Sequence, residues 1–288
     1  MTQEAVCEWA APPPVEQYVP PFEVGVVDGM PAERYHRTEA MSSGGVRAIT
    51  KSARHFRLMR DTINQPTAAM VFGTAVHDGV LEPAQFGARV VCAPKFDMRK
   101  TVDKEAAAEF RAMHAGKSQL PPEEFDRARR CIDAVQAHPS ARKLLDGAIV
   151  ERSFFWNDAR YNVPCKARWD ASNRGLLIDL KTTKDASPDE FAKSIAHWMY
   201  HAQMAHYISA AEHLLDASPQ AAVFIAVESE PPHLVACYEL PGNAILAGLH
   251  IVNLALAKYA DAISTGTWPG YPETIEAIQL PRWALRFD

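Results

Sequence analysis

The sequence contains little cysteine and none of the long apolar runs that mark a membrane protein. Its five cysteines are scattered and odd in number, and none belongs to a C-x-x-C pair, which argues against a disulfide framework. No apolar run approaches the roughly 20 residues that a membrane span needs. The N-terminus also lacks the basic segment and apolar stretch of a secretory signal. We therefore expect a cytoplasmic protein that binds no membrane.

An excess of positive charge is also missing. The formal net charge is −5, whereas proteins that bind nucleic acids are often basic. The distribution of charge matters more than its sum, and bound cations offset the charge of an acidic metal site. Basic residues gather between Arg47 and Arg60, and within this run Arg47, Lys51 and Arg54 are predicted to bind DNA. A solvated helix face is the alternative interpretation of the run.

Length and composition fit an ordinary globular protein. A chain of 288 residues with 48% hydrophobic and 23% charged residues can form one large or two small domains. Residues 1–28 contain two proline runs without a sustained period, which predicts an extended or partly disordered arm. The rest shows neither an internal repeat nor a second core. We therefore predict a single α/β domain over residues 29–288.

Helical patterns dominate the first part of this domain. Ser42 or Ser43 can cap a helix whose apolar residues recur at three- and four-residue steps as far as Phe56. A second helix is predicted over 68–81, and Pro83 would stop it. Residues 86–120 hold a strand-like run at 89–92 and a charged stretch at 99–109, which we expect to be mobile or helical. A further helix is predicted over 121–145.

Strands and helices then alternate in the second part. Ser187 opens a helix that would carry Gln203 and Tyr207, and a long apolar helix over 242–264 would end at Gly266. The predicted strands cover 149–156, 163–170, 176–182, 221–227 and 234–240. Helix, three strands, helix and strand in this order predict a central mixed β-sheet flanked by helices.

The segment from Asp170 to Lys181 carries the strongest chemical signal. Residues two apart on a strand share a face, so Asp179 and Lys181 should project together. Asn173-Arg174-Gly175 is typical of a tight turn, which would fold the strand bearing Asp170 back beside them. Two acids and one amine would then meet, as a Mg²⁺-dependent phosphodiesterase requires. A salt bridge at a strand end is the alternative, but the apolar flanks imply a buried strand, where unpaired charge is costly.

Four more residues are weaker candidates. His77 lies on a helix face with small neighbours and could complete a divalent-metal site; a buried histidine in the core is the alternative. Gln203 and Tyr207 are one helical turn apart, a spacing that an ordinary amphipathic helix also has. Glu151, near the start of the first strand, could be a further acid at the site.

These residues resemble the PD-(D/E)XK nuclease superfamily. Asp170 is similar to the first acid, and Asp179-Leu180-Lys181 to the (D/E)-X-K element. The helix with Gly73-Thr74-Ala75-Val76-His77 and the Q-x-x-x-Y pattern of Gln203 and Tyr207 are similar to the RecB-like and RecE-like branches. The segment from Cys165 to Thr183 most resembles phage and prophage RecE-type exonucleases (exodeoxyribonuclease VIII-like). The resemblance runs from about Pro31 to the Pro281-Arg282-Trp283-Ala284 ending.

The resemblance implies an αβββαβ core and a catalytic Mg²⁺ or Mn²⁺. Its ligands would be His77, Asp170, Asp179 and the backbone carbonyl of Leu180, while Lys181 would orient the attacking water. Some RecB-like relatives carry a four-cysteine iron–sulfur cluster, but no cysteine follows Cys237, so we predict none.

The activity implied is hydrolysis of linear double-stranded DNA by a processive 5′-to-3′ exonuclease of phage-type recombination. RecE-type enzymes form homo-oligomeric rings and work with a single-strand annealing protein, and the resemblance implies both partners here. Gln203 and Tyr207 would contact a DNA phosphate or support the metal site. Two rivals are an endonuclease of the same superfamily and a DNA-binding protein with an inactive nuclease core.

Overall fold

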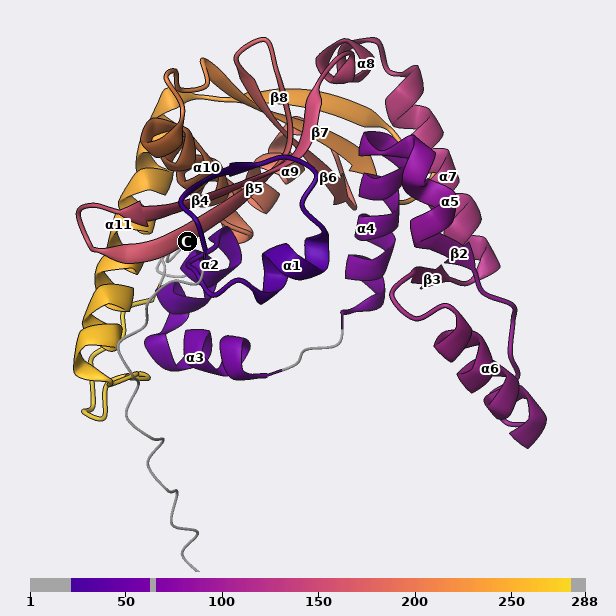
Figure 1. Ribbon diagram of the computed structural model, residues 1–288, viewed down its shortest axis with the longest axis horizontal. Helices are drawn as coiled ribbons and strands as arrows, with labels where there is room; N and C mark the ends of the chain where they lie inside the picture. Colours follow the sequence, from indigo (N-terminus) through magenta and orange to yellow (C-terminus); the bar gives the residue numbers. More distant parts are fainter. Residues whose placement is uncertain (1–21, 63–65, 281–288) are drawn as a thin grey trace, which may run out of the picture.

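A six-stranded mixed sheet forms the centre of the molecule in the computed structural model, which describes residues 22–62 and 66–280 (Figure 1). The strand order is β1-β4-β5-β6-β7-β8, and only β6 and β7 pair in parallel. The strands are β1 (Gly25–Val27), β4 (Ile149–Asp158), β5 (Val163–Asn173), β6 (Leu176–Thr183), β7 (Ala221–Glu228) and β8 (Val235–Leu240). The three strands β4 to β6, followed by helices and then by β7, confirm the predicted mixed sheet.

Helices cover both faces of this sheet and bury one apolar cluster on each. One cluster contains residues of α2 (Ser43–Lys51), α10 (Tyr200–Leu214) and α11 (Gly242–Thr265). The other contains residues of α4 (Ala68–Leu81) and α7 (Pro122–Ala137). Figure 1 shows α11 along one side of the sheet and α4 and α7 along the other. The sheet is therefore buried on both faces, which explains the nearly continuous apolar runs of β6 and β7.

A two-residue hairpin joins β5 to β6. Arg174 and Gly175 have φ angles of 49° and 79°, the left-handed pair that fits a tight hairpin between twisted strands. Only three residue pairs of the ladder follow, the last being Ala171 with Ile178. Beyond that pair β5 stays with β4, and β6 stays with β7. The two strands therefore diverge beyond the pair of Ala171 and Ile178. Asp170 on β5 and Asp179 on β6 are the first residues of the gap between them, which we call the fork.

The face of the sheet to which the side chains of β4 and β5 point also changes at this fork. Val150 and Ala171 pack with the cluster under α4 and α7, whereas Phe154 and Trp169 pack with the cluster under α10 and α11. Strict alternation would put all of them on one face, because they are separated by even numbers of residues along each strand. Glu151 lies between the two sets and has a φ of 53°. Its left-handed backbone turns β4 over while the pairing register with β5 is kept.

Three predicted helices are each divided in two. The helix from Ser42 is capped by Ser42 as predicted, but it ends at Lys51, and Ser52 caps α3 (Ala53–Asp61). Its apolar period continues across the break, so periodicity did not reveal it. The helix predicted over 121–145 is interrupted at His138, before Pro139, and continues as α8 (Pro139–Leu145). The prediction overlooked that proline cannot continue the backbone ladder.

The third division separates Ser187 from Gln203 and Tyr207. The helix opened by Ser187 is α9 (Pro188–His197), and Met199, with a φ of 57°, begins the separate helix α10. Gln203 and Tyr207 therefore both lie on α10, and the prediction that the helix opened by Ser187 carries them was wrong. Ser187 occupies the N-cap position, but its side chain makes no capping hydrogen bond.

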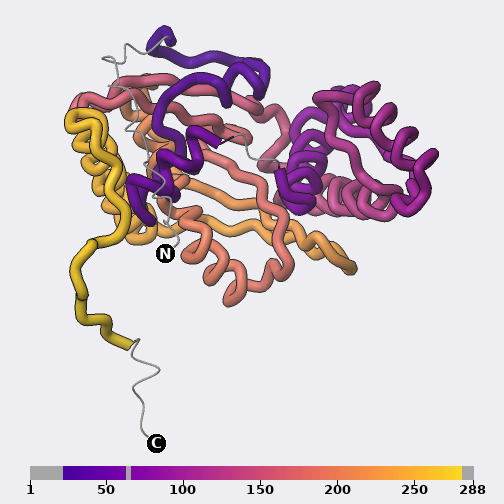
Figure 2. The backbone as a smooth tube through the Cα atoms, turned by 90° about the horizontal axis from the view of Figure 1, so that it is seen from below, coloured from indigo at the N-terminus to yellow at the C-terminus, as the bar shows by residue number. Residues whose placement is uncertain are grey.

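Residues 86–120 form an excursion from the body, seen apart from the sheet in Figure 2. The run at 89–92 becomes β2 (Val90–Cys92), which pairs in parallel with β3 (Ser118–Leu120), a strand not predicted. The charged stretch becomes α6 (Thr101–Met113). The short helices η1 (Pro83–Gln85) and α5 (Phe86–Arg89) connect α4 to β2.

Helix α11 is 24 residues long and, by length and composition, could cross a membrane, although no such run was expected from the sequence. Part of its surface packs in the core, where Val252 and Leu256 are buried. A Cβ on Gly248 would lie 2.2 Å from the carbonyl oxygen of His201, so α10 and α11 touch backbone to backbone there. A core helix needs an apolar face for this packing.

Both ends of the chain extend beyond the described residues. Within the predicted arm, residues 1–21 are outside the description, while Gly25–Val27 form edge strand β1 and pair with β4. The short helix α1 (Ala32–Arg37) follows. The Pro281-Arg282-Trp283-Ala284 ending also lies outside the described residues. Cys92, Cys131, Cys165 and Cys237 are free thiols.

Candidate active site

Asp179 and Lys181 meet on β6, as their spacing predicts. Lys181 Nζ forms an ion pair with Oδ2 of Asp179, whose side chain is fully buried. Burial raises the pKa of Asp179 to about 6, although the Lys181 charge opposes this shift. For Lys181, burial alone would lower the pKa, but the carboxylates of Asp179 and Asp170 outweigh it and raise the pKa. The lysine therefore stays charged at neutral pH.

Asp170 lies across the fork and is tied to β6 through the backbone. Its Oδ2 accepts a hydrogen bond of 2.8 Å from the amide of Leu180. Because β5 and β6 have separated at this point, no backbone carbonyl of β5 pairs with the Leu180 amide. The Asp170 carboxylate accepts its hydrogen bond instead. Burial raises the pKa of Asp170, partly offset by Lys181 and by the Leu180 amide. The two predicted acids and the lysine are therefore brought together.

His77 reaches the same point from α4. Its Nδ1 lies 3.5 Å from Oδ2 of Asp170, and its imidazole hydrogen-bonds to the backbone of Leu180. Helix α4 lies close to β6, since a Cβ on Gly73 would be 3.4 Å from Oγ1 of Thr182. Burial, together with the charge of Lys181, lowers the pKa of His77. The ring is therefore neutral at neutral pH, the state in which an imidazole binds metal.

Gln203 and Tyr207 approach from the opposite face on α10. The amide Nε2 of Gln203 donates to Oδ1 of Asp179 at 2.8 Å and to the Tyr207 hydroxyl at 3.0 Å. Tyr207 is buried, and burial raises its pKa well above the ordinary value. Its backbone carbonyl accepts from the indole nitrogen of Trp169, which fastens α10 to β5. Gln203 thus fixes the orientation of the buried acid.

Glu151 lies beside this group, paired with a residue that the sequence analysis did not single out. Its carboxylate accepts a hydrogen bond from Nε of Arg168 in an ion pair. Burial and the nearby charge of Asp170 raise the pKa of Glu151, and the Arg168 charge opposes the rise. Arg168 is two residues before Asp170 on β5, and this spacing was the available signal. The partnership depends on the register with β4, which the sequence does not reveal.

The three basic residues predicted to bind DNA lie at different distances from the site. Arg47, on α2, lies over the ring of Trp198 at 5.7 Å and influences the pKa of Tyr200. The ring of Tyr200 lies 4.8 Å from Nζ of Lys181, so the charge of Arg47 acts on a side chain that contacts the predicted lysine. The sequence analysis had not assigned Tyr200 or Trp198 to the site. Lys51 and Arg54 are exposed, and neither makes a contact with the acids or Lys181 in the described part of the chain.

The donor set suits a hard divalent cation. Two carboxylates, a backbone carbonyl and a neutral imidazole are ligands that Mg²⁺ and Mn²⁺ accept. Within the described ranges no three His, Cys, Asp or Glu side chains form a preassembled cluster. Both carboxylate oxygens of Asp179 are already engaged, because Oδ2 pairs with the Lys181 ammonium and Oδ1 accepts from Gln203. The residues fit a cation by chemistry, and Lys181 must move off Oδ2 to admit one there.

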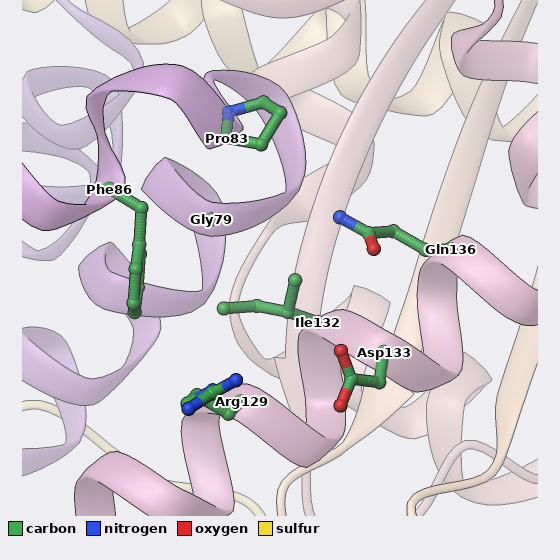
Figure 3. A pocket seen from close by; sticks show the side chains of 7 residues that line it. All are labelled: Gly79, Pro83, Phe86, Arg129, Ile132, Asp133 and Gln136. Carbon is green, nitrogen blue, oxygen red and sulfur yellow. The ribbon is translucent and has the colours of Figure 1, made fainter.

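Two hollows of the described surface lie away from this site. One, of about 150 Å³, is set between α4 and α7, with Gly79, Phe86 and Ile132 around it and polar residues at its rim (Figure 3). The other is a polar cleft of about 440 Å³ whose lining includes Lys166 and Tyr259. Neither lining contains a predicted metal ligand.

Comparisons with known proteins agree with this architecture. The model of a family described as a PDDEXK-like domain of unknown function (DUF3799) matches residues 42–281. A candidate exonuclease from Eubacterium rectale has a similar structure, with a TM-score of 0.61 at 12% identity over 88% of this chain and 95% of that one.

A phage-related exonuclease from Haemophilus somnus matches with a TM-score of 0.37 at 12% identity, over 82% of this chain and all of the other. The search of curated proteins found no match. The Eubacterium rectale structure shares the fold of this chain.

Proposed function

The chain belongs to the family of PDDEXK-like domains of unknown function, and on that premise we propose that it is a metal-dependent nuclease that digests linear double-stranded DNA from an end. The observation that carries the proposal is the convergence of Asp170, Asp179 and Lys181 at the fork between β5 and β6. Burying charged groups in a central strand costs free energy, and such groups gather at functional sites. Hydrolysis of a phosphodiester uses all three.

The cation site would consist of His77, Asp170, Asp179 and the Leu180 carbonyl. Mg²⁺ or Mn²⁺ bound there would supply a Lewis acid that acidifies a bound water and neutralises phosphate charge. Asp170 is already oriented by the Leu180 amide, and Asp179 by Gln203. The chain thus holds both carboxylates in place before a cation arrives, which limits the reorganisation that binding requires.

Lys181 would act on the water and the phosphate. Its ammonium lies at the mouth of the fork with only 15% of its side chain exposed, beside Asp179 and under the ring of Tyr200. With a cation held by the two carboxylates, the ammonium of Lys181 would donate a hydrogen bond to the attacking water or to a phosphate oxygen. Gln203 would keep Asp179 aimed at the cation, and Tyr207 would support Gln203.

Action at DNA ends is favoured by what surrounds the site. The described residues form the central sheet, its covering helices and the small β2–α6–β3 excursion, and they form no separate domain that could read an internal base sequence. The Eubacterium rectale neighbour, which shares the fold, is described as a candidate exonuclease. A 5′-to-3′ direction, a ring of identical subunits, a single-strand annealing partner and a cytoplasmic role in recombination complete the proposal.

A digestion assay tests the proposal directly. Linear duplex labelled at one end and a covalently closed circle of the same sequence are incubated with the protein, in Mg²⁺ and in EDTA. We expect progressive loss of the linear duplex to mononucleotides and a residual strand, in Mg²⁺ only, while the circle stays intact. Discrete internal fragments from the circle would instead favour an endonuclease. Binding of both DNA molecules without cleavage of either would favour an inactive DNA-binding protein.

A further inference from the structure

A third carboxylate stands beside the two acids but is already neutralised. Glu151 faces the position of Asp170 in the register of β4 and β5, and the two carboxyl groups interact electrostatically. The left-handed backbone of Glu151 is an unfavourable conformation for a residue with a side chain, and such positions gather at functional sites. Glu151 is therefore placed next to the cation site at a conformational cost.

The partner of Glu151 is held firmly in place. Arg168 has 15% of its side chain exposed, its Nε donates to Glu151, and its Nη1 is buried without a hydrogen-bond partner among the described residues. Its guanidinium lies 5.7 Å from the ring centre of Tyr35, a buried residue of α1. The guanidinium thus lies between Glu151 of β4 and Tyr35 of α1, with little of its side chain exposed.

Helix α1 is in turn fastened to the sheet. Lys166, two residues before Arg168, donates to the backbone carbonyls of Tyr35 and Thr38 at 2.8 and 2.7 Å. Its ammonium also lies 4.7 Å from the centre of the Tyr35 ring. A cation at the C-terminal end of a helix is favourable, and this one closes α1 over Arg168. The Glu151–Arg168 pair is therefore a fixed part of the site.

The charges around the fork then allow for one divalent cation. Asp170, Asp179 and Glu151 are three carboxylates, and Lys181 and Arg168 are the two cations paired with them. One net negative charge remains. A single divalent cation and one phosphodiester would bring the total to zero, whereas a second divalent cation would leave an excess of positive charge in a buried place.

We propose that the ion pair with Arg168 prevents Glu151 from binding a second divalent cation. The site would then bind one metal ion, at Asp170 and Asp179. This inference rests on the proposed metal-dependent function and adds its metal stoichiometry. It also assigns Arg168 a positioning role, since its Nε donates to Glu151 and its Nη1 is buried. Removing its charge should turn Glu151 into a metal ligand.

The test counts metal ions and does not depend on activity. Calorimetric titration with MnCl₂ at neutral pH should give one ion per chain for the wild type and for Arg168→Lys, which keeps the positive charge. Arg168→Gln should bind two, and the double variant R168Q/E151Q should return to one. The matched control is Arg152→Gln, on the same sheet, which breaks the ion pair of Arg152 Nε with Asp28 at 2.7 Å and should keep one ion.

Several outcomes would overturn the inference. They are two ions in the wild type, one ion in a folded R168Q, or two ions in R168Q/E151Q. If R168Q does not fold, Glu151→Gln decides, because the inference requires it to keep one bound ion and a lost ion would contradict it. A wild type that binds no metal would remove the proposed function as well, which separates the failure of that function from the failure of this inference.

Discussion

The carboxylate of Asp179 is fully buried, and its burial has a cost in folding stability. Its pKa is raised from 3.8 to about 6, chiefly by burial. Between these two values the folded protein binds the proton more tightly than the unfolded chain does. The stabilising contribution of the proton is therefore complete below pH 3.8 and is lost as the pH rises through about 6. Above that, the ionised group costs roughly 3 kcal/mol at 1.36 kcal/mol per pKa unit.

This sign predicts that an inactivating substitution stabilises the protein. Asp179→Asn mimics the neutral acid, so in EDTA it should exceed the wild type in stability by up to about 3 kcal/mol at pH 7.5. The gain should disappear near pH 4, where the wild-type acid is itself protonated. Urea unfolding at the two pH values measures it. Asp126→Asn, at an exposed position, is the control and should show no such gap. Equal stability of Asp179→Asn and wild type at pH 7.5 would contradict this account.

At the scale of elements, the site depends on how closely helices approach the sheet. The backbone contact between Gly248 and His201 fixes α10 against α11, and α10 in turn carries Gln203 to Asp179. The divided helix at Met199 matters for the same reason, because a continuous helix from Ser187 could not change direction before Gln203. Orientation of the buried acid is thus a consequence of packing between two helices.

The basic face of α2 and α3 gives a second prediction. Replacing Arg47, Lys51 and Arg54 by Gln should weaken duplex binding in EDTA without changing Mn²⁺ affinity. The slope of log affinity against log salt should lose roughly 0.9 for each phosphate contact removed. Arg47→Gln alone should account for part of this, because Arg47 is exposed on α2 and its charge acts on Tyr200, which contacts Lys181.

Lys104→Gln is the control for this experiment, since Lys104 is exposed on α6, away from the fork. It should leave the salt slope as it is in the wild type. An unchanged slope in the triple variant would return the basic run to a solvated helix face.

The sequence was most informative where a local pattern determines structure. The apolar runs of β4 to β6 and the turn at Arg174-Gly175 were predictable because strand patterns and turn chemistry act within a few residues. The break at Ser52 was not, since the apolar period runs through it and the capping serine competes with helix continuation only in the folded context. Strands as short as β1 and β3 carry no period at all.

At the scale of the whole molecule, the site is assembled from segments far apart in the chain. Asp170, Asp179 and Lys181 were predictable because one hairpin brings them together. The pairing of Glu151 with Arg168 was not, because it requires the register between β4 and β5 and the left-handed turn at Glu151. Long-range register is a property of the folded sheet, and a single sequence does not state it.

The arrangement of these elements gives each group at the fork a separate role. Four elements, α4, β5, β6 and α10, place a neutral imidazole, two carboxylates, an ammonium and an amide around one fork. The account assigns the carboxylates to the metal and the ammonium to the chemistry. Because these roles differ, substitutions at Asp179 and Lys181 should separate metal binding from hydrolysis.

The most direct test measures both properties in two variants. Asp179→Ala and Lys181→Ala are titrated with Mn²⁺ by calorimetry and assayed on end-labelled linear duplex with Mg²⁺. The account predicts that Asp179→Ala loses metal binding and hydrolysis together, whereas Lys181→Ala binds Mn²⁺ and digests no DNA. Digestion at the wild-type rate by pure, folded Lys181→Ala, or undiminished Mn²⁺ binding by Asp179→Ala, would contradict the account.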